Sequence, residues 1–403
     1  MKVLVAFHGG SLSGIDTYAE QIAAAGSTTP NSVTLAALGA DNAKNLADRL
    51  SGLGIRVITD AQVFSPRRRG TALTLPGLAS RDLREQLETI LRRLGERFDV
   101  AHLNHPALAP VARRYCDRVI VAAWFYPHSP GARVAQTWHH TGRQLLRSTA
   151  LAVKGLAHYR NDELGYRQSD SVVAPTARLT EQLRGLGIRA VTSAPPCGTL
   201  GDVDCQLEPV GQGLPSDVPK CPESKKIVIC CGDLSHPRKN VKAGLAAARL
   251  LGESGRSFEL DLIGRNSNCL RADLGRLPDN IKVSTLGSLP AQELRAQFRR
   301  ADVLLLPSLY EEWGYVATEA ALRGARVVTF PVYPFIDILV DPFGACAADM
   351  TAAALARALE QAIDSRADRP QVQRAASDLF GTQASARRLD AIWSVPDHSD
   401  GDA

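Results

Sequence analysis

The chain has 403 residues, of which 45% are hydrophobic and 22% are charged. These values are ordinary for a globular protein and exclude a disordered chain, a collagen-like chain and a small disulfide scaffold. At about 150 residues per domain, the length predicts two or three domains, with two favoured. The net charge is +5, with 9 Lys and 38 Arg. This excess alone does not indicate nucleic-acid binding, and no apolar run of about 18 residues predicts a transmembrane helix.

The N-terminus and the cysteines together predict a cytoplasmic protein. The apolar stretch after Lys2 is too short for the core of a signal peptide. None of the eight cysteines forms a C-x-x-C pair, and no histidine cluster has the spacing of zinc ligands. Cys230 and Cys231 lie inside an apolar run, which favours reduced thiols in a core. We therefore expect free thiols and no metal site.

Short apolar runs alternate with segments of helical periodicity along the first half of the chain. The runs are continuously apolar, which is typical of parallel strands buried on both faces. The predicted strands are 3–7, 32–37, 55–58, 100–103, 119–123 and 171–174, and the predicted helices include 14–24, 81–97 and 176–186. This order predicts an α/β domain over residues 1–195.

Residues 196–225 are rich in proline and glycine and are predicted to form an interdomain linker. The alternation then restarts and predicts a second α/β domain over 226–380. Its predicted strands are 227–231, 259–263, 303–306 and 326–330, with helices at 241–251 and 315–323. The fold class is therefore α/β, with two Rossmann-like doubly wound sheets. Because such sheets bind ligands beyond the carboxyl ends of their strands, we expect the two domains to face each other across a cleft.

The most informative segment follows the predicted strand 303–306. A turn carries the two carboxylates of Glu311 and Glu312, and Gly314 then permits a close approach of the backbone. A plain turn with solvated glutamates is the alternative interpretation.

The predicted helix after Gly314 can bind an anion. The amides of Gly314, Tyr315 and Val316 stand at its start, where backbone N–H groups have no partner within the helix. Glu319 lies about one turn further on, where a carboxylate suits the ribose hydroxyls of a nucleotide.

Two other segments offer groups to a nucleotide. Gly232 ends a predicted strand, and the loop after it presents Arg238 and Lys239, which together can clamp a diphosphate. A solvated basic turn is the alternative for this loop. The backbone near Ser288 and Leu289, just before a predicted helix, is placed to read a base edge.

These three segments, in this order, resemble the donor-binding half of retaining GT-B glycosyltransferases of family four. Glu311 and Glu319 stand as the E-x7-E pair of that family, and residues 228–240 resemble its glycine-arginine…lysine phosphate loop. Weaker resemblances lie at residues 13–16, 99–106 and 169–176, and in a terminal helix at about 381–396. In this fold that helix crosses back onto the N-terminal domain.

The resemblance implies transfer of a hexose-type sugar from a UDP- or GDP-linked donor to a small polar acceptor, with retention at the anomeric carbon. The nucleotide-sugar is a substrate, and neither a cofactor nor a metal is expected. Glu319 would bind the ribose, Glu311 a sugar hydroxyl, and Lys239 the diphosphate leaving group, whose stabilisation is the main catalytic demand. The expected donor-binding residues are Gly14, Gly232, Arg238, Lys239, Ser288, Leu289, Glu311, Gly314, Tyr315, Val316 and Glu319.

The phosphate loop departs from the family pattern. The family has an arginine directly after the glycine, and this chain has Asp233 there. The loop is also one residue longer up to Lys239. We expect Arg238 to take the place of the missing arginine.

The N-terminal half departs from the pattern as well. The family places a histidine near the reacting sugar, where this chain has Trp124, and His128 follows four residues later. We predict that His128 acts with Glu311 and Lys239 in catalysis. We also predict that His105, Trp124 and His128 bind the acceptor. An ordinary loop histidine is equally consistent with His128, and His102 is predicted to lie in a strand core.

Two other functions fit the same residues. A nucleotide-sugar epimerase of the same fold needs no acceptor, and a non-catalytic nucleotide-sugar-binding protein is consistent with Asp233 and the missing histidine. A Rossmann dehydrogenase is disfavoured because no G-x-G-x-x-G follows the first strand. Arg-rich, Lys-poor usage suggests, by analogy, bacterial secondary-metabolite or other small-molecule biosynthesis. The sequence leaves the base, sugar, acceptor atom and oligomeric state open, a homodimer being one option.

Overall fold

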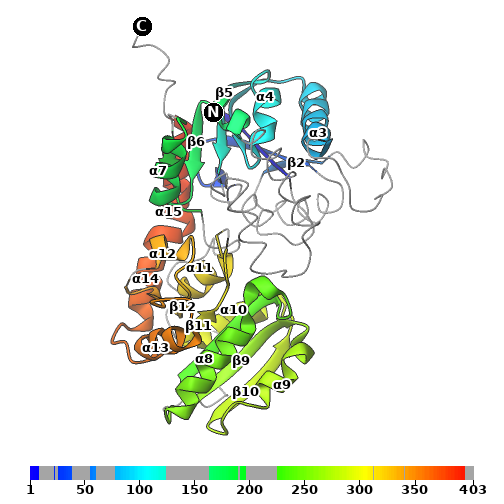
Figure 1. Cartoon of the computed structure of the whole chain (residues 1–403). Coiled ribbons are helices and arrows are strands. Elements are labelled where there is room, and N and C mark those ends of the chain that lie inside the picture. Colours follow the sequence, from blue (N-terminus) through cyan, green and yellow to red (C-terminus); the bar gives the residue numbers. More distant parts are fainter. Residues whose placement is uncertain are drawn as a thin grey trace. The chain divides into compact units, whose positions relative to one another are not determined.

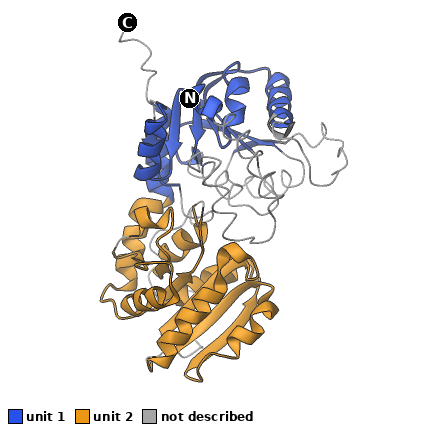
Figure 2. Ribbon diagram, in the orientation of Figure 1, with its two compact units in different colours: residues 1–200, 382–403 blue, residues 201–381 orange. Residues whose placement is uncertain are grey.

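A computed structural model describes most of the chain. The described residues are 1–8, 22, 26–38, 55–59, 78–123, 163–188, 191–196, 225–311, 313–339 and 341–394. The chain divides into two compact units, of which unit 1 comprises Met1–Leu200 with Thr382–Ala403 and unit 2 comprises Gly201–Gly381 (Figure 2). The predicted linker lies almost wholly outside the described residues, as does the predicted helix 14–24 apart from Ile22.

Unit 1 is built on a seven-stranded parallel sheet with the order β3-β2-β1-β4-β5-β6-β7. Strands β2, β5 and β6 of this sheet are labelled in Figure 1. Its strands are β1 (Lys2–His8), β2 (Ser32–Leu38), β3 (Arg56–Thr59), β4 (Phe98–Leu103), β5 (Cys116–Ala122), β6 (Ser171–Ala174) and β7 (Val191–Ser193). The strand order reverses between β1 and β4. That reversal is the place where an open α/β sheet leaves room for a ligand.

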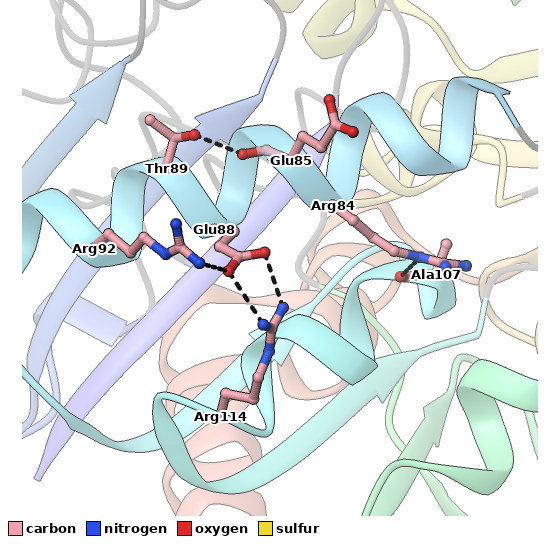
Figure 3. Close-up of polar contacts among 7 residues, drawn as sticks. All are labelled: Arg84, Glu85, Glu88, Thr89, Arg92, Ala107 and Arg114. Carbon is pink, nitrogen blue, oxygen red and sulfur yellow. Dashed lines mark hydrogen bonds and ion pairs between the residues drawn. The ribbon is translucent and has the colours of Figure 1, made fainter.

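Helix α3 (Leu78–Leu94) braces the segment that follows β4. It buries Leu83, Leu87 and Leu91 at helical spacing. Glu88 of α3 points toward Arg114 and accepts hydrogen bonds from it at 3.1 and 2.9 Å and from Arg92 at 2.5 Å (Figure 3). The hydrogen bond from Arg114 lowers the pKa of Glu88.

A second side chain of α3 holds the backbone that follows β4. The side chain of Arg84 on α3 donates from Nε to the carbonyl oxygen of Ala107 at 2.9 Å (Figure 3). Ala107 lies in the short 3-10 helix η2 (Pro106–Leu108), which leads into α4 (Ala109–Ala112). The segment that carries His105 is therefore held by α3.

Helix α15 (Thr382–Ser394) belongs to unit 1 although unit 2 precedes it in the chain. The indole of Trp393 is buried and donates from Nε1 to Nδ1 of His102 on β4 at 3.2 Å. Arg118 on β5 donates to the carbonyl oxygens of Ile392 and Trp393 at 2.7 and 3.0 Å. His102 is 1% exposed, so its predicted place in a strand core is confirmed.

Unit 2 is built on a six-stranded parallel sheet with the order β10-β9-β8-β11-β12-β13. Its strands are β8 (Lys225–Asp233), β9 (Phe258–Arg265), β10 (Ile281–Gly287), β11 (Val303–Leu306), β12 (Arg326–Thr329) and β13 (Gly344–Cys346). Helices α8 (Val241–Glu253) and α13 (Ala352–Ile363) share one core cluster with these strands. The prediction of two Rossmann-like parallel sheets is confirmed.

Three sequence expectations concern what the chain lacks. In the described ranges, no helix is long and apolar enough to cross a membrane. The same ranges contain no group of three or more His, Cys, Asp or Glu side chains placed to hold a metal ion. Among the described cysteines, Cys116, Cys230 and Cys231 are free and buried, and burial raises the pKa of Cys116 to about 12.

Protonation of His102 should destabilise unit 1 at acid pH. Burial lowers the pKa of His102 from 6.5 to about 4. Between these values the unfolded chain binds a proton that the folded chain does not, so the free energy of unfolding falls as the pH falls. From pH 7 to pH 5 this loss is about 2 kcal/mol.

The matched variant is His102→Gln, whose amide oxygen can still accept from Trp393 but does not titrate. Denaturant unfolding at pH 7 and pH 5 should show a smaller loss of stability in the variant than in the wild type. Parallel pH dependences in the two proteins would contradict this role of His102.

Candidate active site

The candidate site of unit 2 lies where its strand order reverses. Strands β8 and β11 are neighbours, with Ile227 paired to Val303 and Val228 to Leu304. The chain continues from β8 to β9 on one side of the sheet and from β11 to β12 on the other. The loops that follow β8 and β11 therefore diverge at the carboxyl ends of the strands, and a ligand can enter between them.

An ion pair joins these two loops. Lys239, in the 3-10 helix η3 (Pro237–Lys239) after β8, lies with its Nζ 2.5 Å from Oε1 of Glu311 in the loop after β11. The hydroxyl of Ser308 donates to the same Oε1 at 2.7 Å. The backbone amide of Leu309 also donates to the carbonyl oxygen of Arg238 at 2.8 Å. Glu311 is only 7% exposed, and the two side-chain donors offset the cost of removing its carboxylate from water.

Glu319 belongs to the same neighbourhood. It lies in α11 (Tyr315–Ala321) and is half-buried. Cys230 lies near the end of β8, and burial is the main cause that raises the pKa of its thiol. The charges of Cys231 and Glu319 raise this pKa further, and the charge of Lys239 lowers it. Glu319 and Lys239 thus act electrostatically on one thiol. The structure brings both members of the E-x7-E pair and the lysine to the end of β8.

The loop between Glu311 and α11 is held by aromatic packing. Gly314 has a φ of +78°, and a Cβ atom there would lie 2.4 Å from Cζ of Phe335 at the start of α12 (Phe335–Ile338). Trp313 is 1% exposed and packs edge-on against Phe380 of α14 (Arg369–Phe380), with ring centroids 5.9 Å apart. Glu312 lies outside the described residues.

Asp233, at the position of the family arginine, accepts hydrogen bonds from residues close to it. The carboxylate of Asp233 accepts from the amide and hydroxyl of Ser235 at 2.9 and 2.6 Å and from Asn266 at 3.0 Å. These hydrogen bonds, led by the one from the Ser235 hydroxyl, lower the pKa of Asp233. They stabilise the charged carboxylate, which adds negative charge to the phosphate loop.

One arginine belongs to that loop and another lies beside it. The guanidinium of Arg238 stacks over the ring of Tyr310, 4.9 Å from its centroid. Arg265, the last residue of β9, donates from Nε to the carbonyl oxygen of Gly232 at 3.2 Å. Sequence reasoning singled out Arg238, whereas Arg265 becomes visible only through the pairing of β8 with β9.

The other predicted donor residues occupy more peripheral positions. Ser288 and Leu289 follow β10 and precede α10 (Ala291–Arg300). They lie at the carboxyl ends of the strands, as the ion pair does, but β9 separates β10 from β8. Tyr315 and Val316 form the first turn of α11 and are half-buried. Gly14 lies outside the described residues.

Of the predicted acceptor residues, the structure describes His105. It follows β4 at the strand-order reversal of unit 1 and caps η2, its Nδ1 accepting from the amide of Ala107 at 3.2 Å. Trp124 and His128 lie outside the described residues.

Sequence reasoning missed Ser308 and Tyr310 as members of the site. Both lie inside the segment that carries the E-x7-E pair. Their roles appear only when the loop after β11 packs against the loop after β8, where Tyr310 meets Arg238 and Ser308 shares Glu311 with Lys239. A buried hydroxyl next to a strand end gives no signal of its own in the sequence.

Comparison with known proteins agrees with this geometry. Residues 216–378 match the family described as Glycosyl transferases group 1, and residues 13–195 match the Glycosyl transferase 4-like domain. One match lies in each unit, and both are glycosyltransferase families. Together with the two parallel α/β sheets, they identify the chain as a glycosyltransferase of GT-B fold.

One curated relative and two solved structures are informative. The 2-deoxystreptamine glucosyltransferase of Streptomyces kanamyceticus is 31% identical over 150 residues, which span 35% of this chain and only 37% of that protein. Sucrose-phosphate synthase of Thermosynechococcus elongatus is 15% identical with a TM-score of 0.65, covering 98% of both chains. HepE of Anabaena, solved with UDP-glucose, is 16% identical with a TM-score of 0.61, covering 98% of this chain and 100% of that one. These two structures show the fold alone.

Replacement of Gly314 by alanine should disturb the loop that carries Glu311. The positive φ alone costs about 1–2 kcal/mol for a residue with a Cβ atom. The contact with Phe335 adds about 1–3 kcal/mol of overpacking. We expect thermal unfolding of Gly314→Ala to begin at a clearly lower temperature than that of the wild type.

Gly255→Ala is the matched control. Gly255 has a φ of +93°, but a Cβ atom there would meet nothing within 4 Å. Equal destabilisation by the two substitutions would show that Phe335 adds no constraint at Gly314.

Proposed function

We propose that the chain transfers a hexose from a UDP- or GDP-linked donor to a small polar acceptor, with retention at the anomeric carbon. The observation that carries the proposal is the contact of Lys239 and Ser308 with Glu311 beside Glu319, at the strand-order reversal of unit 2. UDP-glucose is the first donor to test, since a protein of the same fold was solved with it. The relative named as a 2-deoxystreptamine glucosyltransferase supports a small-molecule acceptor.

Lys239 has the central role in the proposed reaction. Cleavage of the bond between the sugar and the diphosphate leaves negative charge on the departing phosphate oxygen. An ammonium group placed beforehand in a water-poor site stabilises such charge far better than bulk water does. Lys239 is tied to Glu311 in the structure, so the diphosphate would share or replace that carboxylate as its partner.

The two glutamates recognise different parts of the donor in this proposal. Glu319 binds the ribose hydroxyls, and Glu311 binds a hydroxyl of the transferred sugar. Arg238 and the amides of Tyr315 and Val316 support the phosphates, and the segment at Ser288 and Leu289 faces the base.

Unit 1 binds the acceptor in this proposal. His105, at the end of β4, is the described candidate, and Trp124 and His128 are proposed with it. His128 is proposed to take the proton of the attacking acceptor group. An epimerase of the same fold is not better supported, because both matched families are glycosyltransferases.

A thermal-shift panel with UDP, GDP, ADP and dTDP tests the donor half of the proposal. A nucleotide that binds only the folded chain raises the melting temperature by mass action. We expect UDP or GDP to give the largest shift, and a panel without any shift would contradict the proposal.

Activity with the matching nucleotide-sugar tests the rest. A panel of polar acceptors should give a glycosylated product whose anomeric configuration, read by NMR, equals that of the donor. Because the proposal assigns the phosphate charge to protein cations, activity should persist in EDTA. Conversion of the donor alone into an epimer would support the epimerase instead.

Arg238→Ala should weaken donor binding if Arg238 replaces the family arginine. Loss of a charge-assisted hydrogen bond costs about 1.5–3 kcal/mol, which corresponds to roughly a tenfold or greater rise in the dissociation constant of UDP. Calorimetric titration of UDP into Arg238→Ala and Arg265→Ala compares the two arginines. An unchanged constant in Arg238→Ala would contradict its role, and a rise only in Arg265→Ala would assign the second charge to Arg265.

A further inference from the structure

We propose that Ser308 is a positioning residue that holds the Glu311 carboxylate for the donor sugar once Lys239 has turned to the diphosphate. This inference rests on the proposed function, because it assumes that Lys239 meets the phosphates and Glu311 the sugar. It adds a residue that the E-x7-E pattern does not contain.

The two donors to Glu311 use the same oxygen atom. Nζ of Lys239 lies 2.5 Å from Oε1, and Oγ of Ser308 lies 2.7 Å from it. No hydrogen bond to Oε2 is formed by any residue that the structure describes. A carboxylate held through one oxygen can present its other oxygen to a sugar hydroxyl.

Lys239 cannot serve both ligands equally well. A diphosphate carries more negative charge than one carboxylate. Because the ammonium of Lys239 stands on a flexible four-carbon chain, it can move toward the diphosphate. When the phosphates attract it, Lys239 weakens its contact with Glu311. Ser308 is then the remaining side-chain donor to Oε1 among the described residues.

The position of Ser308 is fixed on both sides of its backbone. Its neighbour Pro307 packs closely on α8, since a Cβ atom on Gly244 would lie 2.9 Å from Cγ of Pro307. On the other side, the amide of Leu309 donates to the carbonyl oxygen of Arg238 at 2.8 Å. Ser308 itself is 0% exposed. Its hydroxyl is carried on a single carbon of a buried residue, in contrast to the long side chain of Lys239.

The role predicts a selective defect. Without the hydroxyl, Glu311 follows Lys239 or rotates, and the donor loses the contact with its sugar while its nucleotide and phosphates bind as before. Ser308→Ala should therefore weaken the binding of UDP-glucose and leave the binding of UDP unchanged. A hydroxyl that only stabilised the loop would affect both ligands alike.

The experiment measures the dissociation constants of UDP and UDP-glucose by calorimetry for four proteins. These are the wild type, Ser308→Ala, Glu311→Gln and the control Ser385→Ala. Ser385 is also a buried serine, with Oγ accepting from Arg388 at 3.2 Å, but it lies in α15 of unit 1. We expect the wild type and Ser385→Ala to prefer UDP-glucose over UDP. In Ser308→Ala and Glu311→Gln this preference should fall about tenfold.

Other results would contradict either the role of Ser308 or the proposed donor site. If the wild type prefers UDP-glucose and Ser308→Ala keeps that preference, the role of Ser308 is wrong and the proposed function stands. Equal losses of UDP and UDP-glucose binding in Ser308→Ala indicate a structural serine and also overturn the role. If the wild type binds UDP-glucose no more tightly than UDP, Glu311 adds no net affinity for the sugar, and the inference fails while the nucleotide site stands. If it binds neither these ligands nor GDP and GDP-glucose, the proposed donor site fails and the inference fails with it.

Discussion

The buried carboxylate of Glu311 is the constraint on which the candidate site depends. A charge removed from water requires close donors, or the carboxylate would be strongly destabilising. The donors come from two loops, since Lys239 follows β8 and Ser308 follows β11. They can meet because β8 and β11 are neighbours where the strand order reverses. The packing of Gly314 against Phe335 then fixes the far end of the same loop. The geometry of the site is thus a consequence of sheet topology as much as of the residues that form it.

The features predicted well are those whose cause is local. A strand buried on both faces leaves an unbroken apolar run, and the predicted strands 171–174 and 303–306 coincide with β6 and β11. Helix α11 begins at Tyr315 as predicted, because Gly314 adopts a backbone conformation that ends the preceding loop. The contact of Lys239 with Glu311 is not local, but both residues follow parallel strands, whose carboxyl ends lie at one end of the sheet.

The features missed depend on contacts between distant residues. Strand β10 mixes polar and apolar residues, and most of its length is only partly buried at the edge of the sheet, so its sequence lacks the continuous apolar signal. Strands β7 and β13 span three residues each and are defined by their pairing with β6 and β12. The hydrogen bond from Trp393 to His102 joins residues 291 positions apart. No local pattern encodes such a partner, although the buried strand that carries His102 was recognised.

The charges near the phosphate loop are balanced before a donor arrives. Among the described residues, Lys239, Arg238 and Arg265 carry positive charge, while Glu311, Glu319 and Asp233 carry negative charge. Hydrogen bonds from its own loop lower the pKa of Asp233 and stabilise its charged form. A donor phosphate that binds Lys239 must therefore compete with the Glu311 carboxylate. In the proposed exchange the cation leaves the carboxylate for the phosphate, and the carboxylate keeps another donor. The Ser308 hydroxyl is placed to be that donor, so the replacement of the family arginine by Asp233 makes the internal pairing of the site more important.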